Sequence, residues 1–393
     1  MNKDFKLNIW KLYLLKFFVS LHFFGGVMIP FFTDWGGISF IQIMFLQSWF
    51  MLWIFILEIP TGAIADYWGR KQSITLACFV NAIAALIYAS IPNFFIFLIG
   101  EFLWALSAAL LSGAEEAFVY DTLKKIKKTK KSKKIFGSVE SFKLTGIMIG
   151  APLGSIIASY FDLRSPMLFA SIPLMTAFFI SLTLKEPKTR RKIESRRYIS
   201  ILKGGIKFFY KNKILKILAL DMIVIAAISY FIIWLYQPML IQANVDIIYF
   251  GFVHAAFVVS QILVLNNFER IENLLRSKKR LIFFSSLITG IMFVIGGLTS
   301  FIPLVLMVII LAGGFGLSRE VLFASYMNKF IPSSKRATVI STVSMIKRFV
   351  LVIINPFVGL MVDWSLSYTL IILGIIAIVF STVSRVEESH LID

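Results

Sequence analysis

The chain has 393 residues, of which 58% are hydrophobic and only 16% are charged, and its mean hydropathy is +0.84. Soluble globular domains are about 45–50% apolar and about 25% charged, and disordered chains are less apolar still, so the composition excludes both classes. The formal charge of +19 would indicate nucleic-acid binding in a soluble protein, but its distribution along the chain indicates otherwise. A single cysteine, Cys78, excludes an intrachain disulfide and a cysteine-based metal site.

Twelve apolar runs predict an all-α integral membrane protein. A helix that crosses the hydrocarbon core needs about 20 apolar residues, and the alternating ten-residue pattern of a membrane β-barrel is not seen. The first run is too long for a cleaved signal peptide, and Lys11 and Lys16 interrupt its start. The runs are Trp10–Phe32, Phe40–Ala65, Ser73–Ile91, Phe94–Tyr120, Phe136–Phe161, Pro166–Leu184, Ile217–Ile241, Ile247–Asn267, Leu281–Thr299, Ile302–Tyr326, Thr338–Val362 and Tyr368–Ser384.

The basic residues are gathered on one side of these runs. Almost all of the 40 Lys and Arg residues lie in the N-terminal segment, in the loops after the even-numbered runs and after the last run. Loops that face the cytoplasm carry such an excess, so we expect both termini in the cytoplasm and the chain in the cytoplasmic membrane. Topology therefore accounts for the net charge without nucleic acid.

The longest polar segment divides the runs six and six. We predict an N-terminal half over residues 1–187, a cytoplasmic linker over 188–216 and a C-terminal half over 217–393. Apolar residues alternate with lysines over 199–217, which predicts an amphipathic helix on the membrane surface. Two six-helix halves are typical of a duplicated transporter whose site lies where the halves meet. Internal similarity is faint, with Lys143 and Pro152 matching Lys347 and Pro356.

The loop between the second and third runs carries a recognisable motif. It reads Gly62-Ala-Ile-Ala-Asp66-Tyr-Trp-Gly69-Arg70-Lys71. This resembles the signature G-x-x-x-D-x-x-G-R-K of the major facilitator superfamily, at the place where that family carries it. The resemblance implies the twelve-helix fold of that family and secondary transport, with the drug-efflux subgroup left open.

Individual residues of the motif carry separate expectations. Gly62 predicts close approach of two helices, and Gly69 predicts a tight turn. Asp66 is placed to pair with Arg70 or Lys71. In the family the arginine pairs with an acid at the end of the fourth span, and Asp121 occupies that place. The resemblance implies that these residues form a latch that holds the outward-open state.

The fifth run contains Gly146, Gly150, Pro152 and Gly154. The spacing is similar to the glycine-proline motif of antiporters in this family, in a looser form. Small residues predict tight helix packing and the proline predicts a bend, and ordinary membrane packing explains both as well. Drug–proton antiporters of the family usually carry an arginine in the fourth span. Here Glu101 stands in that part of the chain, so an arginine-based coupling scheme is not transferred.

Ionisable residues inside a span are costly and mark a pathway or a buried pair. We expect Glu58, Glu101 and His22 as candidates for proton coupling. Lys347 lies roughly 15 Å into its span, and its neighbour Arg348 points about 100° away, so we expect one to line a cavity and one to pair with an acid. The alternative is that both form pairs between helices. Further cavity candidates are polar residues within spans, namely Arg319, Glu320, Gln47, Asn81, Gln237 and Asn355.

Neighbouring acids suggest structural pairs as well. Glu140 and Lys143 are three residues apart and are expected to pair on one helix face. Glu115 and Glu116 lie near Asp121 and are expected to join the polar network at the cytoplasmic rim.

The sequence contains no Walker A motif, no cluster of metal ligands and no nucleophile motif, so we expect no enzyme, cofactor or metal. The first hypothesis is a monomeric secondary active transporter that works by alternating access and exports amphipathic compounds in exchange for protons. Its partners would be a small-molecule substrate, a proton or other ion, and membrane lipids. Uptake or facilitated diffusion of a polar or anionic solute is the alternative, and a non-transporting sensor or membrane enzyme is a remote one.

Overall fold

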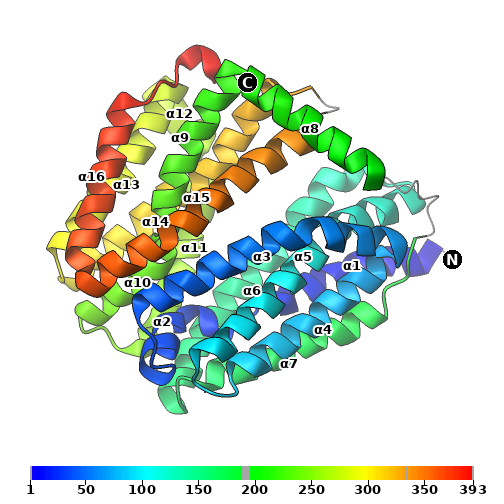
Figure 1. Cartoon of the computed structure of the whole chain (residues 1–393), viewed down its shortest axis with the longest axis horizontal. Helices are drawn as coiled ribbons and strands as arrows, with labels where there is room; N and C mark the ends of the chain where they lie inside the picture. Colours follow the sequence, from blue (N-terminus) through cyan, green and yellow to red (C-terminus); the bar gives the residue numbers. More distant parts are fainter. Residues whose placement is uncertain (1, 188–194, 333–334, 392–393) are drawn as a thin grey trace. The chain divides into compact units, whose positions relative to one another are not determined.

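The computed structural model describes residues 2–187, 195–332 and 335–391. Within them every regular element is helical, which confirms the predicted all-α class (Figure 1). The longer helices are α1 (Asn2–Val19), α3 (Phe40–Tyr67), α4 (Arg70–Tyr88), α5 (Phe94–Lys125), α6 (Ser132–Tyr160), α7 (Ser165–Leu182), α8 (Ser195–Lys211), α9 (Lys213–Tyr230), α10 (Ile232–Gln242), α11 (Phe250–Asn266), α12 (Phe268–Leu275), α13 (Lys278–Leu298), α14 (Ile302–Lys329), α15 (Arg336–Trp364) and α16 (Leu366–Val383). The short ones are η1 (Phe23–Gly26), α2 (Met28–Pro30), η2 (Phe31–Trp35), η3 (Thr129–Lys131), η4 (Ile247–Tyr249) and η5 (Glu388–His390).

Eleven helical segments are long and apolar enough to cross a membrane, and a bent pair at the start of the chain makes up to twelve. The chain is therefore a multi-pass membrane protein. The first predicted run is not one straight span, because Phe5–Gly26 and Met28–Trp35 meet at 68°. The glycine pair before the bend and Pro30 after it explain the break, since neither residue type sustains a regular helix.

The predicted surface helix is also two elements. The linker residues 188–194 lie outside the described part of the chain, and α8 follows them and ends at Lys211. The side chain of Asn212 accepts a hydrogen bond from the Leu215 amide at 3.1 Å and so caps a new helix, α9. Ile214 therefore lies in the first turn of α9 and not on a surface helix that runs from 199 to 217.

Contacts divide the chain into two units. Unit 1 comprises residues 1–194 with 247–255, and unit 2 comprises 195–246 with 256–393. Both units use the same packing scheme. In unit 1, α4 packs against α5 and α7. In unit 2, the corresponding helix α13 packs against α14 and α16, and Figure 1 shows α13 beside α16.

Helix α16 illustrates why such helices pack with their small residues inward. Its buried face includes Gly374 and Ala377, whereas large apolar side chains such as Ile376 and Val379 are exposed. A Cβ atom built on Gly374 would lie 2.6 Å from the carbonyl oxygen of Gly290 in α13. Leu370 and Leu373 are buried on the same face. Because lipid is as apolar as leucine, burying such side chains gains little, and close backbone contact contributes to holding these helices together.

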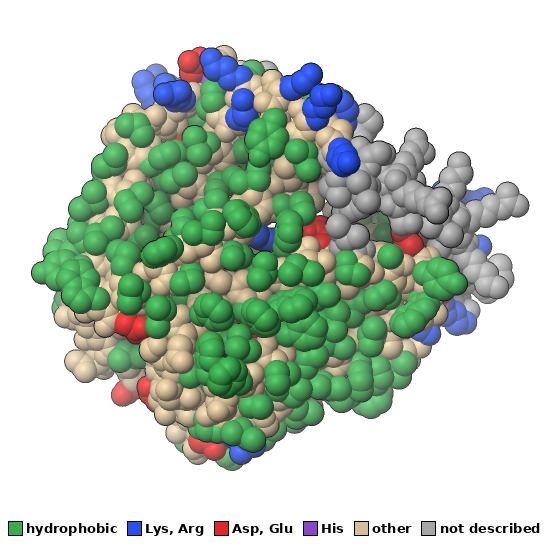
Figure 2. Space-filling model, viewed as in Figure 1, with side chains coloured by type: hydrophobic (Ala, Val, Ile, Leu, Met, Phe, Trp, Pro, Cys, Tyr) green, Lys and Arg blue, Asp and Glu red, His purple; other side chains and the backbone are tan. Residues whose placement is uncertain are grey.

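Figure 2 shows the resulting surface, with apolar side chains over the flanks of each unit. In unit 2 the blue Lys and Arg side chains gather at the end that carries α8 and the C-terminus, at the top of the view. We call this end of each unit, where the lysine-rich loops lie, the basic end.

Candidate functional site

A buried carboxyl lies in unit 1, far from the basic end. Glu101 is in the second turn of α5 and is only 3% exposed. Gln47 of α3 donates a hydrogen bond from Nε2 to Glu101 Oε1 at 2.9 Å. Among the described residues Glu101 forms no ion pair. The sequence predicted Glu101 for coupling and Gln47 for the cavity as separate candidates, and the structure places them together.

Tyr88 completes this cluster from a third helix. It is the last residue of α4, it is fully buried, and its hydroxyl approaches the Glu101 carboxyl. The hydroxyl makes no hydrogen bond of good geometry with any described residue. A buried hydroxyl without a partner is costly, so the cluster has unused hydrogen-bonding capacity. Glu101, Gln47 and Tyr88 are named the carboxyl cluster below.

Aromatic rings surround the carboxyl cluster and extend from it to the break in the first span. The Tyr88 ring lies 4.6 Å from that of Trp104, and Trp104 lies 5.0 Å from Phe24. Phe24 in turn stacks on the imidazole of His22 at 5.2 Å. His22 and the carboxyl cluster are thus joined by rings and not by hydrogen bonds.

The glycines of the fifth span serve close packing. A Cβ on Gly146 would lie 2.6 Å from the Phe17 carbonyl oxygen, and one on Gly150 would lie 2.8 Å from the His22 amide nitrogen. Gly154 faces the Phe23 backbone in the same way. Pro152 lies within the same helix, α6. The predicted tight packing is confirmed. The neighbouring segment is the broken first span, and α6 contacts its backbone at and around His22.

The motif loop lies at the basic end of unit 1. Arg70 forms an ion pair with Asp121, as the resemblance implied, and its guanidinium also donates to the Ala117 carbonyl oxygen at 2.8 Å. Gly69 has φ +122°, a conformation that favours glycine, so the predicted turn is confirmed. The expectation for Gly62 is wrong here, because a Cβ atom on it would meet no atom within 4 Å.

An acid that the sequence analysis did not single out completes this end. The amides of Arg70 and Lys71 donate to the two carboxylate oxygens of Glu186, at 3.2 and 2.6 Å. Those are the first two amides of α4, which have no partner within their own helix. Glu186 lies four residues after Leu182, the last residue of α7, so it ties the end of α7 to α4. Its position after a predicted span was the only signal in the sequence.

A further ion pair joins helices in each of the two units. In unit 1, Lys16 of α1 pairs with Glu115 of α5 at 2.7 Å. In unit 2, Arg319 of α14 is fully buried and pairs with Asp221 of α9 at 2.5 Å. Ser384 also donates to Asp221, and Arg319 donates to the Ile282 carbonyl oxygen at 2.5 Å. The predicted cavity residue Arg319 is therefore engaged inside unit 2.

Helix α15 carries the other predicted basic residues. Lys347 pairs with Glu320 of α14 at 2.5 Å, as expected for at least one of the two residues. Arg348 is half-buried, and its role in a cavity stays a prediction. The predicted pair of Glu140 and Lys143 is confirmed at 2.8 Å.

The remaining candidates are scattered. Gln237 of α10 donates to the Tyr236 hydroxyl at 2.8 Å and is buried. Asn355 of α15 is fully buried, and neither polar atom of its amide has a partner among the described residues. Glu58 in α3 and Asn81 in α4 are half-buried. Over the described ranges 2–187, 195–332 and 335–391, no group of His, Cys, Asp and Glu could hold a metal ion.

Comparison with known proteins places this arrangement in context. Residues 12–265 match the sequence pattern of the Major Facilitator Superfamily. "Multidrug resistance protein 2" of Bacillus subtilis (strain 168) is 32% identical over 171 residues, which is 41% of this chain and 41% of that relative.

Solved structures share the fold at low identity. The nucleoside transporter NupG superposes with a TM-score of 0.79 at 12% identity, covering 97% of this chain and all of that one. A POT family transporter in complex with 5-aminolevulinic acid gives 0.77 at 14% identity over 98% of this chain and 96% of that one. The D-xylose-proton symporter gives 0.72 at 12% identity over 97% and 98%.

Proposed function

Because this chain belongs to the major facilitator superfamily and is a secondary transporter, we propose that it exports amphipathic compounds in exchange for protons. The proton would bind at the carboxyl cluster, with Glu101 as its carrier. The observation that carries this proposal is the burial of Glu101 beside Gln47 with no cation among its described neighbours.

The physical argument starts from the energy of burying charge. A carboxylate removed from water without a cation is strongly destabilised, whereas the neutral acid is buried at much lower cost. A carboxyl of this kind takes up a proton where its surroundings are dry and releases it when water or a cation reaches it. Alternating access would provide that change of surroundings.

The neighbours of Glu101 suit both states of the acid. The Gln47 amide donates to the carboxyl oxygen, and the Tyr88 hydroxyl can either donate or accept. Aromatic rings, including Trp104 and Phe97, keep water from the cluster and would offer flat apolar faces to a hydrophobic substrate. His22, at the far end of the ring row, is the second group that could hold a proton.

Two observations support export over uptake. The relative from Bacillus subtilis is named for multidrug resistance, and it matches about two fifths of its own length. The glycines of α6 pack against the broken first span, in a segment similar to the glycine-proline motif of antiporters. Neither fixes the direction, so the experiment measures it.

The latch is proposed together with the transport cycle. The ion pair of Arg70 with Asp121 ties α4 to α5 at the basic end, and Asp66 lies one turn before Gly69. We propose that the basic end faces the cytoplasm and that these residues stabilise the outward-open state. An Asp66→Asn variant should lower the population of the outward-open state, which is measured as a change in spin-label distances across the basic end.

The test of coupling uses purified protein in liposomes with an imposed pH gradient. We expect wild type to move an amphipathic dye such as ethidium in the direction opposite to the flow of protons. In Glu101→Gln this gradient-driven flux should be at least about tenfold lower. Glu140→Gln removes an exposed carboxyl from α6 and is the matched control, which should retain wild-type flux. Equal flux in Glu101→Gln and wild type would contradict the role of Glu101.

The same experiment separates the alternatives. Dye accumulation that follows the proton gradient inward would indicate uptake. Flux that ignores the gradient in wild type would indicate facilitated diffusion, and movement of an anionic solute but of no dye would move the substrate class to anions.

A further inference from the structure

A basic cavity opens in unit 2, and it is lined by none of the residues proposed for transport. It has a volume of about 970 Å³. Its walls come from the first turns of α9, from Lys279 in α13, and from the end of α16 with the tail that follows. All of these elements belong to unit 2 and meet at its basic end. We call it the α9–α16 cavity.

Positive charge in this cavity is not neutralised. Its lining includes the cationic residues Lys213, Lys216, Lys279 and Arg385, and none of them forms an ion pair with another described residue. The Asp221 carboxylate at its base is already compensated by Arg319. The exposed Glu387 is the other acid in the lining, and Glu388 next to it accepts from the amide of Lys279. Four cations still outnumber these two uncompensated acids, so a net positive charge remains.

The walls change from cationic to apolar along one helix face. Lys213, Lys216, Ile217 and Leu220 follow one another at helical spacing on α9 and all line the cavity. Leu220 is 58% exposed, and Val383 on the opposite wall is 61% exposed. A ligand held by the lysines would therefore have its remaining length against apolar side chains on the membrane-facing flank.

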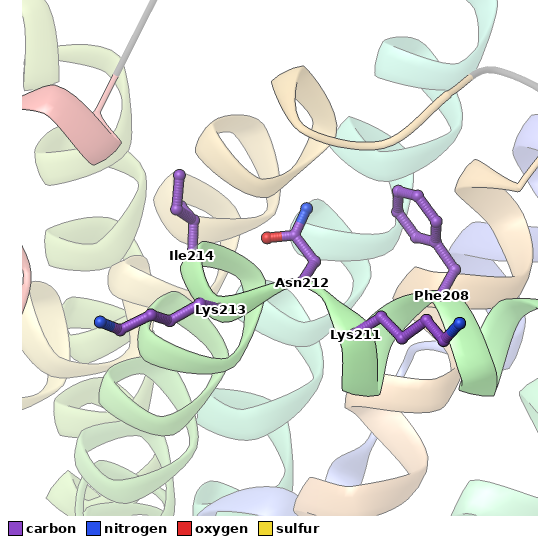
Figure 3. Close-up of a pocket in the computed structure, with 5 residues that line it drawn as sticks. All are labelled: Phe208, Lys211, Asn212, Lys213 and Ile214. Atoms are coloured by element: carbon purple, nitrogen blue, oxygen red, sulfur yellow. The ribbon is translucent and has the colours of Figure 1, made fainter.

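A smaller cavity of about 410 Å³ adjoins the first at the junction of α8 and α9. Lys213 and Ile214 line both cavities. Figure 3 shows Lys211 and Lys213 pointing away from each other on either side of Asn212. Because Asn212 is held as the cap of α9, the two lysines are spread apart, and the positive surface continues along the junction.

We propose that the α9–α16 cavity binds the headgroup of an anionic phospholipid, with an acyl chain along Leu220 and Val383. The unpaired cations supply the attraction for a phosphate group, and basic pockets between membrane helices are suited to such headgroups. A soluble phosphate would use the lysines alone, whereas a phospholipid would also place an acyl chain against the apolar half of the wall. Occupancy would also hold α9, α13 and α16 together at their basic ends. This proposal does not depend on the transported substrate.

The test is native mass spectrometry of the full-length protein in detergent, titrated with phosphatidylglycerol or phosphatidylcholine. We expect phosphatidylglycerol to bind preferentially, and the triple variant Lys213→Gln, Lys216→Gln, Arg385→Gln to bind it roughly tenfold more weakly. The control removes the same charge from the exposed segment that runs from the end of α5 through η3, with Lys124→Gln, Lys128→Gln and Lys131→Gln, and should change affinity less than about twofold.

Two further arms identify the ligand. Leu220→Gln should weaken phosphatidylglycerol binding without changing any charge, and millimolar inorganic phosphate should not displace the lipid. Displacement by phosphate, an unaffected Leu220→Gln variant, equal losses in both triple variants or equal binding of the two lipids would each overturn the proposal. If the triple variant fails to elute as a folded protein, Arg385→Gln alone is measured with Lys124→Gln as its control.

Discussion

The two units show the same contacts at their basic ends but differ where a proton could bind. Glu115 in α5 and Arg319 in α14 each stand ten residues before the last residue of their helix, and each forms an ion pair with the first spanning helix of its own unit. The signs are reversed, since Lys16 partners Glu115 and Asp221 partners Arg319. Position and partner are kept while the charges are exchanged, so what the fold needs there is a pair and not a particular sign.

A second shared contact is a glutamate that caps a helix. Glu186 accepts from the first two amides of α4, and Glu388 accepts from the first two amides of α13, at 2.8 and 2.9 Å. Each glutamate follows the last spanning helix of its unit. These contacts recur because each unit has to close the same end of the same bundle.

The differences lie on the same pair of helices. When α5 and α14 are aligned at their last residues, Asp121 corresponds to Ser325 and Glu101 corresponds to Val305. Because serine carries no charge, unit 2 lacks an acid at the position that partners the motif arginine in unit 1. Its counterpart of the buried carboxyl is an apolar side chain. The helix packing and its ion pair recur in both units. Asp121 and Glu101, which we propose for the latch and for proton coupling, have no acidic counterpart at the aligned positions of unit 2.

The strongest challenge to this comparison is removal of one partner of the buried pair. Arg319→Gln leaves Asp221 as an uncompensated charge inside unit 2, which should cost about 3–5 kcal/mol of stability. We expect a large loss of folded protein by fluorescence-detected size-exclusion chromatography and a much lower Tm.

The reversed signs allow a sharper version. The double variant Asp221→Lys with Arg319→Glu reproduces the arrangement of unit 1, and we expect it to be more stable than either single variant. A double variant no better than the worse single one would show that the pair is not interchangeable.

Substitution of closely packed glycines should give the next largest loss of stability. Gly150→Ala in unit 1 and Gly374→Ala in unit 2 each place a Cβ against the backbone of a neighbouring helix or segment, which should cost about 1–3 kcal/mol. Gly62→Ala is the matched control in open space and should be neutral or slightly stabilising. Thermal unfolding of the three variants measures this, and equal Tm values for all of them would refute the packing argument.

The pair of unit 1 should matter less than that of unit 2. The side chains of Lys16 and Glu115 are 18% and 10% exposed, against 0% and 4% for Arg319 and Asp221. Lys16→Gln should therefore cost about 1 kcal/mol, well below the loss for Arg319→Gln. The reverse order of Tm values would contradict the ranking by burial.

The glutamate cap gives the smallest effect and a pH dependence. Burial raises the pKa of Glu388, but hydrogen bonds from Ser277 and from the amides of Lys279 and Lys278, with the Lys278 charge, outweigh it and hold the pKa below its ordinary value of 4.5. Its contribution is then fully present above that ordinary value and is lost as pH falls through the lowered one. Glu388→Gln should lower stability by less than about 1 kcal/mol at pH 7, since the group is largely exposed.

The check is the difference in Tm between wild type and Glu388→Gln across pH. That difference should be constant near neutrality and shrink toward zero at acidic pH. A difference that persists unchanged at pH 3 would show that the carboxylate charge is not what caps α13.

Much of this structure follows from local patterns in the sequence. Hydropathy locates the spans, and the spacing of three residues predicts the pair of Glu140 and Lys143. The family motif predicts the pair of Arg70 with Asp121.

Contacts between helices that are distant in the chain could not be predicted from the sequence. Gln47 meets Glu101 across 54 positions, and Asp221 meets Arg319 across 98. Such contacts depend on how each helix is rotated about its axis, and a uniformly apolar span does not encode that rotation. The break in the first span was not predicted although Gly25, Gly26 and Pro30 stand in the sequence, because hydropathy measures the apolar length of a span and not its straightness. The packing of α6 against it through Gly150 and Gly154 is again a contact between segments distant in the chain.

The central claim is that Glu101 carries the proton that is exchanged for substrate. The most direct test records proton movement with a pH indicator trapped inside liposomes, while a concentration gradient of the transported substrate alone drives transport. We expect wild type to move protons opposite to the substrate, and Glu101→Gln to move substrate down its gradient without proton movement. An unchanged ratio of protons to substrate in Glu101→Gln would contradict the account.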